Sequence, residues 1–222
     1  EILKKLVNEQ LVNLRNLHIN LGAEVIDGKI ERDGLKTLTF KKGNEIKKEK
    51  FDYVINATYA QYNRFSHWMG FPIKPVRIDF VESVIVRLPL PKVSLAIMDG
   101  PFTNLVPTGN IDLYTLVHIK ESILDRYTLK KGLIKKTAPK KSSVKRTIEK
   151  SMEWFPILKK AEFVETRNVY RAVNAFREHD DARPSDINYH GFGCWSILGG
   201  KVVNSVLVAK EIALEIKNIT AK

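Results

Sequence analysis

The chain has 222 residues, of which 44% are hydrophobic and 28% charged, with one cysteine and a formal net charge of +12. This composition is typical of a globular protein that is long enough for one or two domains with a buried core. No apolar run reaches the ~20 residues that cross a bilayer, and one cysteine excludes an internal disulfide, so we predict no transmembrane segment and a cytoplasmic, reducing location.

The N-terminal region shows helix and strand patterns in alternation. Residues 2–17 place apolar side chains at helical spacing and predict an amphipathic helix. Strands are predicted over 17–26 and 37–40, and a lysine-rich turn follows around Gly43. In the strand predicted over 51–57, the run YVINA is uncharged on both faces, which is typical of a strand buried in a parallel sheet.

From Val76 onwards the pattern changes to alternating apolar and polar residues. The segment 76–88, VRIDFVESVIVRL, predicts a long strand, and shorter apolar runs follow between the turn signals Asp-Gly-Pro and Pro-Thr-Gly-Asn. Such an arrangement is typical of an antiparallel meander. Further elements are predicted as a helix over 143–155, an extended segment over 163–176 and a final helix over 202–217. The predicted apolar stripe of the final helix comprises Val202, Val206, Ala209, Ile212, Ala213 and Ile216.

Most of the excess positive charge lies in residues 130–150, KKGLIKKTAPKKSSVKRTIEK, with nine Lys or Arg against one Glu. Nucleic-acid binding is favoured by aromatic side chains among the cations or by zinc-finger spacing of Cys and His, and the segment has neither. We predict a solvated face with no specific nucleic-acid partner, and a surface for polyanions or membranes is the alternative. No metal site is predicted, because metal-ligand spacing is lacking among His67, His118, His179 and His190.

These elements give an α/β pattern at both ends of the chain and an antiparallel sheet in the middle. The predicted fold class is therefore α/β (α+β). The simplest organisation is a first domain built from two separate parts of the chain, with a second domain inserted between them.

The junction before the final helix, Gly199-Gly200-Lys201, predicts an anion site. Glycines allow a close approach of the backbone to a flat ligand, and a helix N-terminus with a lysine favours negative charge. Spacing excludes a P-loop, since Trp195 stands where its first glycine is required and Val202 where Ser or Thr is required. A structural turn is the alternative for this short motif.

FDYVINATY (51–59), the Gly-Gly-Lys junction and DGPFTNLVPTGNIDLYTLVH (99–118) together resemble the glycine/D-amino-acid oxidase (DAO) superfamily of FAD-dependent oxidoreductases. The resemblance implies FAD as cofactor and oxidation of a C–N or C–O bond of a small anionic substrate, by hydride transfer to flavin N5. It also implies cofactor-domain parts at 1–70 and 190–222 around a substrate domain at 71–189.

The resemblance further implies which residues contact the cofactor. Val25 resembles the residue whose backbone meets the adenine, and Ala57 and Thr58 the stretch under the diphosphate, with Tyr59 where the family usually has glycine. The turn that faces the flavin pyrimidine ring resembles Gly199, Gly200, Lys201 and Val202. A lysine and a helix N-terminus there would stabilise the negative charge of the reduced ring.

Substrate anchoring is implied for Arg171, which lies where many members place an arginine that binds a carboxylate through two parallel hydrogen bonds. Arg183 is the rival candidate, and for each of the two a surface ion pair is the alternative. Tyr170 and Tyr114 are candidates for lining the pocket, although half-buried tyrosines are common on strands.

The chain departs from the family in having no G-x-G-x-x-G motif, and it begins at Glu1 in helical register. We therefore expect this chain to be the later part of a family member. Its expected partner is the N-terminal FAD-binding segment, which is missing here. Residues 1–222 alone are expected to bind FAD poorly, to be inactive, and to expose apolar side chains on the first helix and on Tyr53–Ala57. The sequence leaves the substrate and the electron acceptor open. A non-catalytic basic protein that binds anions or nucleic acid through 130–150 is the alternative function.

Overall fold

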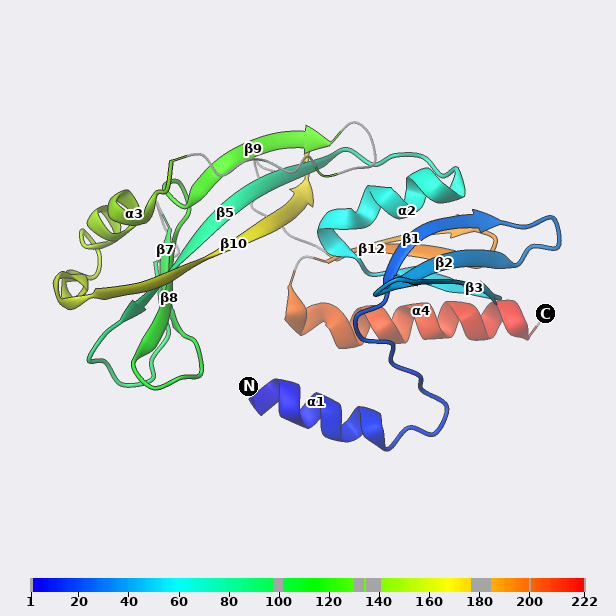
Figure 1. The fold of residues 1–222 in the computed structure, drawn as a ribbon, viewed down its shortest axis with the longest axis horizontal. Helices are drawn as coiled ribbons and strands as arrows, with labels where there is room; N and C mark the ends of the chain where they lie inside the picture. Colours follow the sequence, from blue (N-terminus) through cyan, green and yellow to red (C-terminus); the bar gives the residue numbers. More distant parts are fainter. Residues whose placement is uncertain are drawn as a thin grey trace.

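In the computed structural model, the described part of the chain forms three β-sheets and four α-helices (Figure 1). The antiparallel sheet of the middle region lies to one side, and the two smaller sheets lie with the C-terminal helix on the other. The described residues are 2–97, 102–129, 134, 141–176, 185–199 and 201–221.

The first helix, α1 (Ile2–Val12), is shorter than the predicted 2–17 and is joined to the first strand by a long loop (Figure 1). Its register is amphipathic, but Leu6 and Val7 are exposed, as is Leu14 beyond its end. The exposure of apolar side chains that was expected on the first helix is thereby confirmed.

The first sheet is an antiparallel meander of β1 (Glu24–Ile30), β2 (Lys36–Lys42) and β3 (Glu45–Phe51). The strand predicted over 37–40 is confirmed, whereas the strand predicted over 17–26 is wrong in its first part, because β1 starts only at Glu24. The turn itself is only Gly43-Asn44, and the lysines on either side of it belong to the ends of β2 and to β3. This strand is exposed at the sheet edge, where pairing uses the backbone and lysines discourage further strand addition.

The second sheet joins distant parts of the chain in the order β11 (Asp186–Gly191), β12 (Cys194–Leu198) and β4 (Val54–Asn56). β12 and β4 are parallel, which confirms the predicted parallel pairing. Two helices cover its faces. On one face Cys194 packs with α2 (Tyr62–Met69), and on the other Trp195 packs with the C-terminal helix.

β4 is buried on one face only. Val54 and Asn56 are buried, while Ile55 between them is 44% exposed. The prediction that YVINA is covered on both faces is therefore wrong for this chain, and the expected exposure along Tyr53–Ala57 is confirmed at Ile55.

The C-terminal helix α4 (Ser205–Thr220) is preceded by a 3-10 turn, η3 (Val202–Asn204), so the α-helix begins three residues later than predicted. Val208 and Ile212 are the side chains that it buries, against Trp195. The predicted stripe is correct at Ile212 and in part at Ile216. It is wrong at four positions that are exposed because the sheet contacts only one narrow side of the helix, namely Val202, Val206, Ala209 and Ala213.

The third and largest sheet is antiparallel and is organised around one long strand, β5 (Val76–Arg87), which pairs with β10 (Glu162–Asn174) along its length. The predicted meander and the predicted strands at 76–88 and 163–176 are confirmed, although the turn at 99–101 lies outside the described residues. The other strands are β6 (Leu95–Ala96), β7 (Thr103–Pro107), β8 (Leu113–His118) and β9 (Ile123–Leu129).

α3 (Val144–Ser151), inside the predicted 143–155, packs on this sheet and is followed by a 3-10 turn, η2 (Pro156–Lys160). The buried carboxylate of Glu82 accepts hydrogen bonds from the backbone N–H and the hydroxyl of Ser143, at 2.6 and 2.8 Å. A carboxylate at this helix N-terminus satisfies an otherwise unpaired N–H and complements the helix dipole. The contact therefore fixes α3 to β5.

The observed class is α/β (α+β), with an antiparallel sheet between the two parts of the chain that form the parallel pair. No helix among the described residues combines the length and the apolar character needed to cross a membrane.

Candidate functional site

Two cavities adjoin the outer strand β4 and share Ile55 in their linings. The first, which we call the β1–α2 cavity, has a volume of about 450 Å³ and lies between β1, β4 and α2. The second, the α4 cavity, has about 650 Å³ and lies between β4, β12 and α4. Both volumes are in the usual range of ligand pockets.

The β1–α2 cavity brings together Val25 and Thr58, two of the predicted cofactor residues that are 33 positions apart in the sequence. Thr58 is held in place by Asn56, whose side-chain oxygen accepts hydrogen bonds from the Thr58 backbone N–H and hydroxyl at 3.2 and 2.6 Å. The Asn56 amide in turn donates to Ser196 and to the Tyr62 carbonyl, both at 3.0 Å. This buried network fixes the backbone at the end of β4.

The α4 cavity brings together Ala57, Gly199, Lys201 and Val202, all predicted to lie along the cofactor. A Cβ atom at position 199 would meet no protein atom within 4 Å, so no contact within the described chain requires glycine there. The space beside Gly199 is therefore open. Gly200 lies outside the described residues.

Tyr59 also lines the α4 cavity, in an unusual backbone conformation. Its φ is +53°, which lies in the left-handed region. Residues other than Gly and Asn adopt this backbone conformation at a cost of about 1–2 kcal/mol. The sequence thus places a tyrosine where the backbone conformation suits glycine.

Lys201 stands directly before the 3-10 turn η3 and is exposed, and its carbonyl accepts the Asn204 backbone N–H at 3.1 Å. Because η3 continues into α4, the lysine lies one turn ahead of the α-helix. The side chain of its N-cap residue, Asn204, makes no capping hydrogen bond. The lysine and the helix start of the predicted anion site are thus both present, but the three residues of η3 separate Lys201 from the first residue of α4.

Arg171 and Tyr170 are neighbours on β10 and therefore point to opposite faces of the sheet. Tyr170 packs against Phe80, with ring centroids 5.0 Å apart. Arg171 forms an ion pair with Asp79, its Nε lying 3.1 Å from the carboxylate. The two residues therefore lie on different faces of the sheet, and Arg171 forms an ion pair, the alternative to its predicted anchoring role.

Asp79 is fully buried and also contacts the Nε atoms of Arg126 at 2.9 Å and Arg77 at 3.2 Å. Burial alone raises the pKa of a carboxyl, but the hydrogen bond from Arg171 and the surrounding positive charges outweigh it, so the pKa of Asp79 lies below its usual value. The carboxylate is therefore ionised at neutral pH and orients the guanidinium groups around it.

Tyr170, Arg171 and a further predicted residue, Tyr114, line neither of the two cavities. Tyr114 is buried in the core of the large sheet, where its hydroxyl donates to the carbonyls of Leu90 and Pro91, so its predicted pocket-lining role is wrong. Arg183 lies outside the described residues. Among the described residues, His, Cys, Asp and Glu form no cluster of three or more with metal-binding geometry.

Sequence analysis missed Arg64 and Trp68, which line the β1–α2 cavity from α2. The guanidinium of Arg64 lies 4.8 Å from the centre of the Trp68 ring and donates a hydrogen bond to Glu24 at 2.9 Å. Their spacing of four residues, one helical turn, was the available signal.

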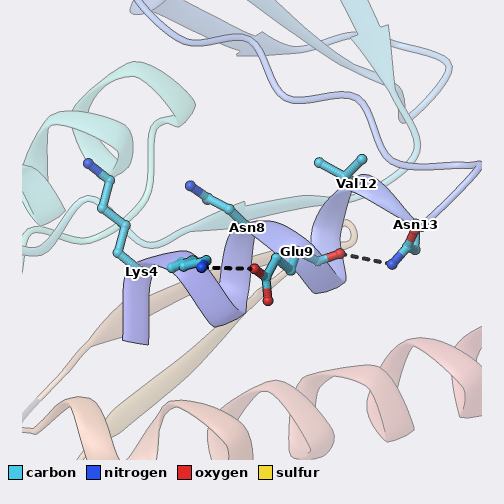
Figure 2. A pocket seen from close by; sticks show the side chains of 6 residues that line it. Lys4, Asn8, Glu9, Val12 and Asn13 are labelled. Atoms are coloured by element: carbon cyan, nitrogen blue, oxygen red, sulfur yellow. Dashed lines mark hydrogen bonds and ion pairs between the residues drawn. The ribbon is translucent and has the colours of Figure 1, made fainter. Parts of the chain in front are cut away.

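A further hollow lies along α1 (Figure 2), lined by residues of that helix and its C-terminal end alone. Lys5 pairs with Glu9 at 3.9 Å, and Asn13 donates to the Glu9 carbonyl at 2.9 Å. One helix face cannot enclose a ligand, so we do not count this hollow as a site.

Comparison with solved structures relates the geometry to known proteins. The glycine oxidase of Geobacillus kaustophilus superimposes with a TM-score of 0.57 at 16% identity, over 88% of this chain and 47% of the oxidase. The L-proline dehydrogenase of P. horikoshii gives 0.54 at 16%, over 80% and 44% of the two chains. The glycerol-3-phosphate dehydrogenase of Bacillus halodurans, complexed with FAD, gives 0.58 at 12%, over 88% and 39%.

Over the matched residues, this chain shares the fold of these three oxidoreductases. The resemblance found in the sequence is thereby confirmed at the level of the fold, and the chain spans less than half the length of each of these oxidoreductases. Neither the protein-family models nor the curated protein sequences give a match.

Proposed function

We propose that this chain is part of an FAD-dependent oxidoreductase that oxidises a C–N or C–O bond of a small anionic substrate. The observation that carries the proposal is the pair of adjoining cavities. On a DAO-type fold, they gather six of the seven predicted cofactor residues around Ile55. The neighbour in complex with FAD supports the choice of cofactor.

The linings of the two cavities suit FAD in chemistry, since they combine apolar side chains with the hydroxyl of Thr58 and the ammonium of Lys201. The β1–α2 cavity, with Val25 and Thr58, would take the adenosine end, and the α4 cavity would take the flavin end beside Gly199 and Lys201. When bound, FAD would supply the acceptor for the hydride that leaves the substrate carbon. The ammonium of Lys201 and the start of the C-terminal helix would stabilise negative charge at that end.

The substrate is proposed to be an amino acid, a hydroxy acid or a polyol phosphate. The similar structures include two enzymes named for amino acids and one named for a glycerol phosphate. Arg171 is proposed to hold the acidic group, with Asp79 fixing the orientation of its guanidinium. Arg183 is the rival, and Tyr170 is proposed for the pocket on its own face of the sheet.

The organisation of the whole protein is also a proposal. We assign residues 1–70 and 190–222 to the cofactor domain and 71–189 to the substrate domain. The FAD-binding segment expected to complete the cofactor domain is its partner, and residues 1–222 alone are proposed to be inactive. We propose a cytoplasmic location for the complete protein. The alternative function based on 130–150 gains no support from the described residues.

An anaerobic absorbance experiment on the complete protein tests the proposal. The purified protein should show a flavin band near ~450 nm, which a substrate from a panel of amino acids, hydroxy acids and polyol phosphates bleaches. Ala57→Leu, which fills the α4 cavity, should lose the flavin, whereas Ala221→Leu on the exposed C-terminus should retain it. Complete protein that carries no flavin and takes up none on reconstitution would refute the proposal.

A further inference from the structure

The β1–α2 cavity contains an ion pair at its rim. Among the described residues that line it, Arg64 is the one cation and Glu24 the one carboxylate. The Arg64 side chain is 24% exposed, and that of Glu24 is 62% exposed. The guanidinium is thus half-enclosed by the cavity, while its partner stands in solvent.

Trp68 restricts the guanidinium further. The cation lies over the indole ring at 4.8 Å, a distance at which the two groups attract each other. A planar guanidinium held against a ring presents its N–H donors in one plane, which suits recognition of phosphate or carboxylate oxygens. Arg64 is therefore oriented before any ligand arrives.

The rest of the lining is divided by chemistry. Val25, Leu38 and Phe65 give an apolar floor, while Thr58 and Gln61 add polar groups near Arg64. An apolar floor that takes a flat ring, next to a cation that takes an anion, is the complement of a nucleotide.

We infer that Arg64 is a nucleotide-binding residue that exchanges the Glu24 carboxylate for a phosphate oxygen when the adenosine end of a dinucleotide enters this cavity. The exchange is favourable because an exposed carboxylate holds arginine weakly, whereas a phosphate accepts two parallel hydrogen bonds from it. Glu24 then acts as a competitor that occupies Arg64 in the empty cavity. This inference rests on the proposed function, which places that end of FAD here.

Calorimetric titration of the flavin-free complete protein with ADP and with adenosine tests the inference. Arg64→Gln should weaken ADP binding about tenfold or more, as expected for a lost charge-assisted contact, and should leave adenosine binding unchanged. Arg64→Lys should recover part of the loss. Glu24→Gln should bind ADP at least as tightly as the unmodified protein. Arg87→Gln, which breaks the exposed pair with Asp112 at 2.9 Å elsewhere in the fold, is the matched control.

The inference predicts that Arg64→Gln weakens ADP binding and that Glu24→Gln does not, and this difference tests it. If Arg64→Gln and Glu24→Gln weaken ADP binding equally, the pair acts through the fold and the inference is wrong. Equal losses for ADP and adenosine would likewise exclude a phosphate contact. If the unmodified protein binds FAD and ADP, and the Arg64→Gln variant binds ADP as tightly as the unmodified protein does, this inference alone is wrong. Unmodified protein that binds neither ligand overturns the proposed function as well.

Discussion

The substitution Asp79→Asn should destabilise the protein more than any change at an exposed ion pair. Asp79 is fully buried and contacts Arg77, Arg126 and Arg171 from three strands. Asparagine keeps the size of the side chain but leaves guanidinium charge in the sheet without its carboxylate. Breaking a buried ion pair by removing one partner costs about 3–5 kcal/mol. For a chain of this length that corresponds to a fall of roughly 6–20 °C in melting temperature.

Denaturant and thermal unfolding of the complete protein, followed by circular dichroism, measure this loss. Asp112→Asn is the matched control, because it makes the same change in an exposed pair with Arg87. It should cost less than about 1 kcal/mol. If Asp79→Asn is no more destabilising than Asp112→Asn, the buried cluster does not hold the large sheet together and our reasoning about it is wrong.

Three further outcomes are expected. Arg171→Lys should raise the substrate KM with little effect on flavin binding, and the same result for Arg183→Lys alone would transfer the anchoring role to that residue. Lys201→Met should lower the flavin reduction potential by the equivalent of about 1–3 kcal/mol, whereas an unchanged potential would place this lysine away from the ring. Burial lowers the pKa of His118 and His190, so near pH 6.5 the unfolded chain binds more protons than the folded chain. The free energy of unfolding should therefore fall as the pH drops below about 6.5, and substituting both histidines with glutamine should remove this dependence.

The sequence predicted the large sheet well because its strands either alternate apolar and polar residues or form short apolar runs. β5, which pairs with β10 along its length, is the clearest case. It failed at β3, an exposed strand of charged residues that pairs through the backbone. It also overestimated the apolar stripe at Val206, because periodicity shows which side chains lie together but not which side meets a sheet.

For the candidate site, the short motifs found the residues around Ile55 but not their division between two cavities. The positive φ of Tyr59 was also beyond reach, since a tyrosine gives no local signal for it. Arg64 and Trp68 were missed because their spacing of four residues along α2 places them together but does not reveal the contact of Arg64 with Glu24 on β1.

The parallel pair β4–β12 has a consequence for the order of folding. Asn56 and Ser196, which bond across it, are 140 residues apart, and closing a flexible loop of that length costs on the order of 4 kcal/mol in chain entropy. Val76 and Asn174, the first and last residues of the large sheet along the chain, are register partners and lie side by side. Once that sheet has formed, about 40 residues remain to be closed, which lowers the entropic cost by about 1 kcal/mol. We therefore expect the large sheet to form early and both cavities to assemble last, after the end of the chain has been synthesised.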